Sequence, residues 1–382
     1  MLLQNKEIAI VGGGPGGLTL ARLLQLKGAN IKVYERDLNK DARVQGSPLD
    51  LHDESGLAAI IKAGLLNEFK KNYMPGADRL TITNEQAEIF HSDHETKPEE
   101  NFGYEHFRPE IDRGVLRKIL LASLQPGTVV WNNHFLSMEA QKEGWLLHFK
   151  NGTSAYADLV IAADGANSKI RPYITDIKPF YSGITMLEGN VYDAANSTPQ
   201  IAALLRGGKI MAFGNKKDIL MGQKGNGEIG FYASFKTDEN WAKDNGLDYT
   251  DNAQMLAWFK RDYPEWSSIW YELFENAVTP FIPRPIYCMP LDQTWKSLPN
   301  VTMLGDAAHV MPPFAGEGVN MAMLDALELS EYLTSGEQDA IARYEVNMRK
   351  RAAIMAKESL ENGERMHSED ALNTMLRFFE GH

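Results

Sequence analysis

The chain has 382 residues, a length that suits two structural units sharing an interface better than one compact core. Hydrophobic residues make up 43% and charged residues 24%, as in ordinary globular proteins, and the single cysteine, Cys288, excludes intramolecular disulfides and thiolate zinc sites. Lys and Arg total 39 against 51 Asp and Glu; the net charge of −12 argues against a nucleic-acid surface. No stretch approaches the roughly 20 apolar residues of a membrane span. We therefore expect a cytoplasmic protein with neither nucleic-acid nor membrane partners.

The first thirty-five or so residues predict a strand, a glycine-rich turn, a helix and a second strand. The strands are expected at residues 8–11 and 31–34, and the helix at 18–27. Between them, a GxGxxG motif is formed by Gly12, Gly14 and Gly17, with Pro15 inside it. Such glycines allow a tight turn, close approach of backbone to a pyrophosphate, and helix packing on the strand. This order predicts a dinucleotide site.

Two residues after the second strand bear on which dinucleotide binds. Glu35 at the strand end can accept hydrogen bonds from ribose hydroxyls. The unit alone does not decide between FAD and NAD, but Arg36 favours FAD because a guanidinium there can cover the adenine face.

Two later segments repeat the pattern of an acid at the end of a buried strand. Residues 158–165 end in Asp164 and Gly165, and residues 301–309 contain Gly305 and Asp306. A glycine-rich helix start follows at 312–320. This arrangement suits a polyhydroxyl chain carrying an electron-accepting ring: Asp306 can accept from ribityl hydroxyls, and backbone amides of 316–320 can meet negative charge on a reduced flavin.

Together these segments resemble the group A FAD-dependent monooxygenases, the para-hydroxybenzoate hydroxylase-like flavoproteins. The similarity extends over nearly the whole chain and is closest to the TetX-type tetracycline-inactivating monooxygenases. The runs that carry this closer resemblance are Tyr34-Glu35-Arg36-Asp37, Leu49-Asp50-Leu51-His52 and Gly305-Asp306-Ala307-Ala308-His309 through Phe314-Ala315-Gly316.

The resemblance implies FAD, NADPH (or NADH) as reductant, and O2 as co-substrate. Reduced flavin would trap O2 as a C4a-hydroperoxide and deliver one oxygen atom, so we expect neither a catalytic side chain nor a metal site. It further implies FAD contacts at Glu35, Arg36, Asp50, Arg113 and Asp306 and an NADPH contact at Arg43, and Asp112 is a candidate N-cap for the helix that carries Arg113. The predicted cofactor-binding residues are Gly12, Gly14, Pro15, Gly17, Glu35, Arg36, Arg43, Asp50, Arg113, Asp164, Asp306, Pro313, Gly316, Gly318, Val319 and Asn320.

The remaining sequence predicts an α/β protein in which a Rossmann-like FAD-binding domain carries an inserted, mostly antiparallel-sheet substrate domain and a C-terminal helix. Short alternating runs over 128–162 predict a β-meander that returns to the parallel sheet. Strands at 210–213, 219–222 and 229–235, with a hairpin turn at Asn226-Gly227, and helices at 252–263 and 267–277 build the insert. The predicted domains are 1–171 with 291–337 (FAD-binding), 172–290 (substrate) and 338–382 (C-terminal helical segment).

The resemblance places six residues along the substrate pocket: Glu188, Lys209, Met221, Gln223, Phe314 and Met366. Several depart from the tetracycline-inactivating enzymes, with Glu188 in place of an amide, Lys209 in place of arginine and Met221 in place of phenylalanine. Gly230 and Glu317 likewise replace a histidine and a glutamine. We expect a monomer that hydroxylates a phenolic or enolic polycyclic compound, a tetracycline-type antibiotic (inactivating 11a-hydroxylation) or another aromatic or polyketide substrate. An FAD-dependent reductase or dehydrogenase is the alternative of a different class.

Overall fold

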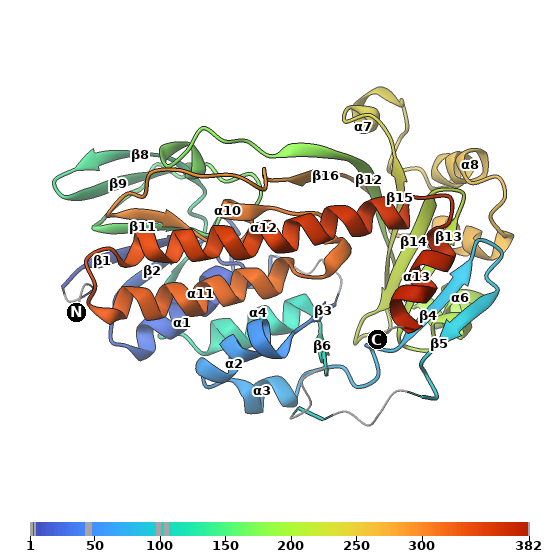
Figure 1. The fold of residues 1–382 in the computed structure, drawn as a ribbon, viewed down its shortest axis with the longest axis horizontal. Coiled ribbons are helices and arrows are strands. Elements are labelled where there is room, and N and C mark those ends of the chain that lie inside the picture. Colours follow the sequence, from blue (N-terminus) through green and yellow to red (C-terminus); the bar gives the residue numbers. More distant parts are fainter. Residues whose placement is uncertain (1–2, 4, 43–47, 97–100, 103–106, 381–382) are drawn as a thin grey trace.

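A parallel sheet forms the first of two units in the computed structural model, which describes residues 3, 5–42, 48–96, 101–102 and 107–380. Its five strands lie in the order β17-β11-β1-β2-β7, and all neighbouring pairs are parallel. Figure 1 labels β1, β2 and β11 of this sheet. The strands β1 and β11 are nearly continuous apolar runs because helices and a second sheet cover both faces. The elements of this unit are β1 (Glu7–Val11), α1 (Pro15–Leu26), β2 (Asn30–Tyr34), β3 (Leu49–Asp50), α2 (Ala58–Lys62), α3 (Leu66–Lys70), β6 (Glu110–Ile111), α4 (Arg113–Ala122), β7 (Val129–Val130), β8 (Phe135–Gln141), β9 (Gly144–Phe149), β10 (Ser154–Ala157), β11 (Leu159–Ala162), β17 (Val301–Met303) and α10 (Asp306–His309).

The predicted meander is present as the three-stranded antiparallel sheet β10-β9-β8, with turns between Gln141 and Gly144 and between Phe149 and Ser154. Residues 129–130 differ from the prediction, because they form β7 and pair with β2 at the edge of the parallel sheet. Alternation of apolar residues identifies a strand but not its partner, so the sequence could not separate β7 from the meander.

The second unit is built on a seven-stranded sheet in the order β16-β12-β15-β14-β13-β4-β5. All its pairs are antiparallel except β13 with β4. Helices α6, α8 and α9 cover one face, where aromatic side chains such as Trp258 and Phe274 form the core. Its elements are β4 (Leu80–Asn84), β5 (Ile89–Ser92), β12 (Phe180–Val191), α5 (Ala194–Ser197), α6 (Pro199–Leu205), β13 (Lys209–Gly214), β14 (Lys217–Gln223), β15 (Ile229–Lys236), α7 (Trp241–Asp244), α8 (Asn252–Asp262), α9 (Tyr271–Asn276) and β16 (Ile282–Cys288).

One segment departs from the predicted domain ranges. Residues 80–92 fall inside the range 1–171 assigned to the FAD-binding domain, yet they supply β4 and β5 of the second sheet. The partner of β4 in this sheet, β13, lies more than a hundred residues further along the chain, and local sequence pattern cannot reveal such a pairing.

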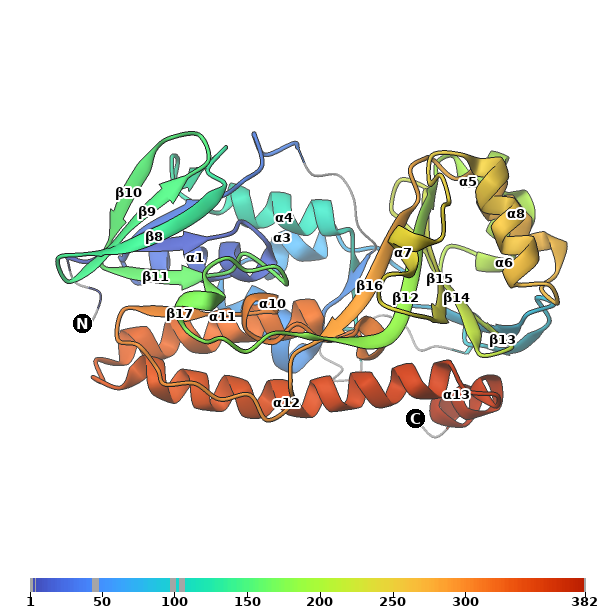
Figure 2. The same cartoon turned by 90° about the horizontal axis from the view of Figure 1, so that it is seen from above.

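Three C-terminal helices connect the two units: α11 (Gly318–Ser335), α12 (Ala340–Met366) and α13 (Ala371–Glu380). Figure 2 shows α12 running along the first unit to the second, where α13 packs on β4 and β13. The predicted fold class is confirmed, and the segment 338–382, where one helix was expected, contains the two helices α12 and α13. None of the helices described here is both long and apolar enough to cross a membrane.

We call the face of the seven-stranded sheet opposite α6, α8 and α9 the inner face. It is the face turned toward α11 and the parallel sheet (Figures 1 and 2). Strand alternation assigns each side chain to one face. Because Leu187, Ile210 and Ile219 belong to the helix-covered core, their neighbours Glu188, Lys209 and Leu220 lie on the inner face.

Candidate active site

The glycine-rich turn after β1 has the shape of a pyrophosphate cradle. Gly12 has φ +114°, and a Cβ there would lie 2.2 Å from the carbonyl oxygen of Ala163. A Cβ on Gly14 would instead meet no atom within 4 Å. The first turn of α1 begins at Pro15 without a side-chain cap. Its free amides and the open space at Gly14 fit a bound phosphate group.

Glu35 closes this turn from the end of β2. Its Oε2 accepts a hydrogen bond from the Gly13 amide at 2.6 Å, and its Oε1 accepts from the Asp37 amide at 3.0 Å. The carboxylate is 2% exposed and keeps further lone pairs for ribose hydroxyls. The side chain of Arg36 is exposed beside it.

Arg117 of α4 is a residue of this site that the sequence reasoning missed. Its guanidinium donates to the carbonyl of Gly13 at 3.3 Å and to Oδ2 of Asp37 at 2.9 Å. It also lies over the ring of Trp131. A signal was available: Arg117 falls between the buried Leu116 and Leu120, on the apolar face of a predicted helix.

The two acid-and-glycine segments are joined by a single buried arginine. Arg171 donates from Nε to the Ala307 carbonyl at 2.7 Å, and from Nη2 to the carbonyls of Asp306 and Ala166 at 2.9 and 3.0 Å. It thereby fixes the loop after β11 to the start of α10. The sequence shows that Arg171 follows the first segment, but it does not show that Arg171 contacts the second segment.

The acids of these segments retain capacity for a ligand. Asp164 accepts from the Lys169 amide through Oδ2 at 2.8 Å, while its Oδ1 is buried and has no partner among the described residues. Asp306 stands exposed at the start of α10, within reach of the positive charges of Arg113 and Arg171. An orphaned buried oxygen beside an open cradle fits a polyhydroxyl, phosphate-bearing cofactor.

A second cluster surrounds the start of α11. His52 lies between two carboxylates, with Nε2 3.2 Å from Oδ2 of Asp50 and Nδ1 3.1 Å from Oε1 of Glu317. The Asn320 amide ties the cluster together, because its Oδ1 accepts from the His52 backbone and its Nδ2 donates to the Asp50 carbonyl, both at 3.0 Å. Of the predicted residues, Gly316 lies beside Asp50, and Gly318 and Val319 open α11 just after it.

The charges of this cluster are strongly coupled. Desolvation acts to lower the pKa of His52, but hydrogen bonds and charges of Asp50 and Glu317 outweigh it and raise the pKa to about 9. Burial acts to raise the pKa of Asp50, but Lys209 and His52 together hold it well below its usual range. At neutral pH, His52 is thus a cation and Asp50 an anion.

Lys209 extends the cluster onto the inner face of the second sheet. Its ammonium forms an ion pair with Glu110, which is 1% exposed and begins β6, where it is the register partner of Asp50 in β3. Burial raises the pKa of Glu110 to about 7, against the opposing charge of Lys209. The predicted pocket residue Lys209 is therefore a partner of a buried acid at the junction of the two units.

The other predicted pocket residues divide between the two faces of the sheet. Glu188 lies on the inner face, and its place in the substrate pocket stays a prediction. The assignments of Met221 and Gln223 to the substrate pocket are wrong, because Met221 is 5% exposed within the helix-covered core and Gln223 pairs with Ile229 on that same face. An alignment shifted by one residue moves a strand side chain to the opposite face.

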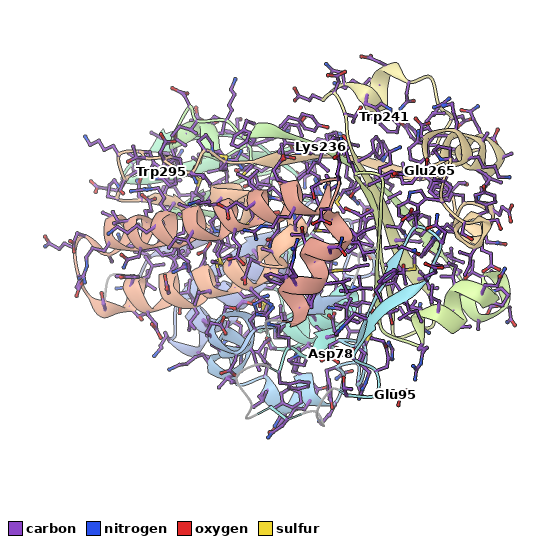
Figure 3. All side chains as sticks on the ribbon, turned by 45° about the vertical axis from the view of Figure 1, so that its right-hand side comes forward. Asp78, Glu95, Lys236, Trp241, Glu265 and Trp295 are labelled. Carbon is purple, nitrogen blue, oxygen red and sulfur yellow. The ribbon has the colours of Figure 1, made fainter. Side chains whose placement is uncertain are left out.

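Phe314 and Met366 lie at the C-terminal end of α12. Phe314 lines a cavity of about 380 Å³ together with Ile184, Pro312 and Gly363. Met366 is 2% exposed and packs in a core with Phe213 and Met375, against which Phe314 also packs. Lys236, labelled in Figure 3, pairs with Glu364 of α12 at 2.6 Å beside this cavity.

Three further predictions concern the helix α4 and the loop before β3. Arg113 is exposed at the first residue of α4, within reach of Asp306. Asp112 occupies the N-cap position, but its side chain does not cap the helix; its Oδ2 accepts instead from the Gly225 amide of the second unit at 3.1 Å. Arg43 lies outside the described residues. Its predicted contact with NADPH stays a prediction.

A profile of a protein family described as FAD binding domain matches residues 5–244 and 294–359, most of the chain. The chain belongs to this FAD-binding family. Among the relatives of this chain, monooxygenase asqM of Emericella nidulans is 29% identical, and the match covers 87% of this chain and 85% of the relative. The 3-amino-4-hydroxybenzoate 2-monooxygenase PtmB3 of Streptomyces platensis is 25% identical, covering 98% and 92%. The protein is a flavin-dependent monooxygenase that uses FAD, NAD(P)H and O2.

Solved structures share the fold of this chain. HpxO of Klebsiella pneumoniae in complex with FAD and uric acid gives a TM-score of 0.77 at 20% identity, covering 99% of this chain and 93% of that one. The tetracycline destructase Tet(51) gives a TM-score of 0.71 at 18% identity, covering 97% and 94%. Group A flavin monooxygenase architecture is thereby confirmed for the chain.

Proposed function

We propose that this flavin-dependent monooxygenase hydroxylates a small phenolic or enolic ring compound held between the inner face of the seven-stranded sheet and the start of α11. The observation that carries the proposal is the meeting of the two units through Lys209 and Glu110, next to Asp50. This contact brings the inner face of the sheet to the residues expected to hold the reactive end of FAD.

The chain's own residues divide the work of binding FAD. The turn at Gly12–Gly17 with Glu35 would hold the pyrophosphate and ribose, and Asp164 and Asp306 would receive the polyhydroxyl chain. The start of α11 would face the ring system, with its amides directed at developing negative charge. Bound FAD supplies the activation of O2, so the protein has to position the substrate and exclude water.

A tetracycline-type substrate is the more specific candidate. It is favoured by the likeness of the fold to Tet(51) and Tet(55), which are tetracycline destructases. The relatives by sequence have other names, among them a 3-amino-4-hydroxybenzoate 2-monooxygenase and a 6-hydroxynicotinate 3-monooxygenase. Because the buried Glu188 already pairs with Arg284, the pocket presents different polar groups from those expected by resemblance. We therefore favour a smaller aromatic substrate and expect weak tetracycline turnover.

The test is NADPH consumption by the FAD-loaded protein with tetracycline, 4-hydroxybenzoate and 6-hydroxynicotinate, with product masses read in parallel. The proposal predicts substrate-stimulated consumption and a gain of one oxygen atom for a monocyclic compound. Robust oxygenation of tetracycline, with no action on simple phenols, would establish the tetracycline-type candidate instead.

A further inference from the structure

We infer that Arg284, held in place by the buried Glu188, forms an oxyanion-binding subsite on the inner face, and that the substrate of the proposed hydroxylation carries a carboxylate there. The inference rests on the proposed function and adds a chemical class to its substrate. It assigns separate roles to the two residues: Arg284 binds the anion and Glu188 positions it.

The position of Arg284 follows from strand pairing. Arg284 of β16 is the register partner of Met186 of β12, and paired residues of antiparallel strands lie on the same side of the sheet. Met186 lies on the inner face because the adjacent Leu187 is in the helix-covered core. Arg284 therefore projects from the inner face at the edge strand of the sheet.

The guanidinium is anchored at one point and open at two. Its Nε donates to Oε2 of Glu188, whose side chain is 4% exposed, whereas the side chain of Arg284 is 48% exposed. Among the described residues, its two terminal nitrogens have no hydrogen-bond partner. Because only Nε contacts Glu188, both Nη groups remain free to donate side by side to the two oxygens of a carboxylate.

The ion pair with Glu188 holds the Arg284 guanidinium in an orientation that favours anion binding. Burying a carboxylate such as Glu188 costs folding free energy unless the carboxylate is paired. Glu188 therefore keeps its contact with Arg284, and this contact holds the guanidinium in one orientation. A pre-oriented arginine loses less conformational entropy when it binds an anion. Two further cations of this face, Lys209 and Lys236, are not available for that task because they pair with Glu110 and Glu364. In a chain with a net charge of −12, Arg284 is thus a local cation with free donors.

The test measures binding and does not require turnover. The FAD-loaded protein is titrated with 4-hydroxybenzoate and with its neutral amide, 4-hydroxybenzamide, and the perturbation of the flavin absorption gives two Kd values. Variants are Arg284→Gln, which keeps a donor for Glu188, Arg284→Lys and Glu188→Gln. Arg261→Gln is the matched control, because Arg261 lies on α8 over the opposite face and pairs with Asp262.

We expect the unmodified protein to bind the acid at least about tenfold more tightly than the amide, since the difference is a charge-assisted hydrogen-bonded pair. Arg284→Gln should bring that ratio close to one, while Arg284→Lys and Glu188→Gln should retain part of it. Arg261→Gln should leave it unchanged. A merely structural role for Glu188 would weaken both ligands equally and leave the ratio intact.

Two outcomes overturn the inference. One is an acid-to-amide ratio near one, or no binding of the acid, in the unmodified protein. The other is a ratio that survives Arg284→Gln while the preference for NADPH over NADH is lost, which would assign the anion to the reductant's phosphate. Failure of the proposed hydroxylation would give a different result. The product would then contain no added oxygen, while the unmodified protein would still prefer the acid to the amide and Arg284→Gln would still lose that preference.

Discussion

Nε of Arg171 lies 2.7 Å from the backbone carbonyl oxygen of Ala307, and this bond joins the loop after β11 to the start of α10. The same guanidinium also holds the carbonyl of Asp306. Two chain segments well over a hundred residues apart, each carrying an acid expected to face FAD, are therefore positioned by one side chain.

Replacement of Arg171 by Gln should weaken FAD binding as well as folding. Three backbone carbonyls would lose a charged donor, and we expect unfolding free energy to fall by about 2–4 kcal/mol and the Kd for FAD to rise roughly tenfold or more. Flavin fluorescence titration and thermal unfolding with and without FAD would measure both. Arg22→Gln is the matched control, because Arg22 also donates to two carbonyls but away from the site. It should lower stability and leave the FAD Kd unchanged; equal effects of both variants on FAD would contradict the account.

Two glycines of the first turn should respond differently to a methyl group. Gly12→Ala would place Cβ 2.2 Å from the Ala163 carbonyl at φ +114°, so we expect loss of folded protein. Gly14→Ala meets no protein atom and has φ −81°, so the apo protein should stay folded, with only the small loss of stability that alanine causes at the N-cap of α1. Its methyl group would occupy space meant for the pyrophosphate and reduce FAD affinity at least tenfold. Normal FAD affinity in Gly14→Ala would show that the cradle is not where FAD binds.

The charge on His52 should make stability depend on pH in a defined direction. With a pKa of about 9 in the folded protein against 6.5 ordinarily, His52 contributes fully below about pH 6.5, and its contribution is lost as the pH rises through 9. The stability advantage of the unmodified protein over His52→Gln should therefore be about 2–3 kcal/mol at pH 6 and shrink toward pH 9.5. Urea unfolding across this range measures it. An advantage that grows with pH would mean that His52 is neutral.

A buried cluster at the end of α12 should behave in the opposite way. Ser234 Oγ lies 2.5 Å from Oδ1 of Asp218 and 2.9 Å from Nε2 of His367, and Nδ1 of His367 lies 2.8 Å from the Gly363 carbonyl. Burial raises the pKa of Asp218 to about 8 and lowers the pKa of His367 to about 4. Both side chains are thus neutral at pH 7, and a protonated Asp218 can donate to Ser234, which in turn donates to His367.

Asp218→Asn should consequently stabilise the protein above pH 4. Folding of the unmodified chain must protonate Asp218, at a cost that grows from its ordinary pKa of 3.8 up to about 8. Asparagine keeps a donor to Ser234 without that cost, so the gain should be near zero at pH 4 and reach about 2 kcal/mol or more at pH 8. Thermal unfolding as a function of pH measures it. A pH-independent loss of stability would instead indicate an ionised Asp218.

The sequence was sufficient for the local parts of the FAD site. The order of strand, GxGxxG, helix and Glu35 predicted β1, α1 and β2 closely, because each depends on neighbours within a few residues. Asp164 and Asp306 could be found in the same way, since each follows a buried apolar strand.

Contacts between segments that are distant along the chain could not be predicted from the sequence. Glu188 reaches Arg284 only because β12 and β16 pair in the second sheet, and Glu110 of β6 reaches Lys209 of β13 only because the two units meet there. Arg284 itself carries no motif. The error at Met221 has a different cause. Its role was taken from a resemblance by position, and an alignment that is shifted by one residue along β14 assigns a side chain to the wrong face of the sheet.

The most direct test of the whole account is the fate of O2. The FAD-loaded protein is supplied with NADPH and a phenolic acid under ¹⁸O2, and the product mass and hydrogen peroxide are measured together. We predict a product carrying one ¹⁸O atom for each NADPH consumed in the substrate-stimulated reaction. Stoichiometric hydrogen peroxide with no label in any product, across the phenolic acids and tetracycline alike, would contradict hydroxylation at the inner face.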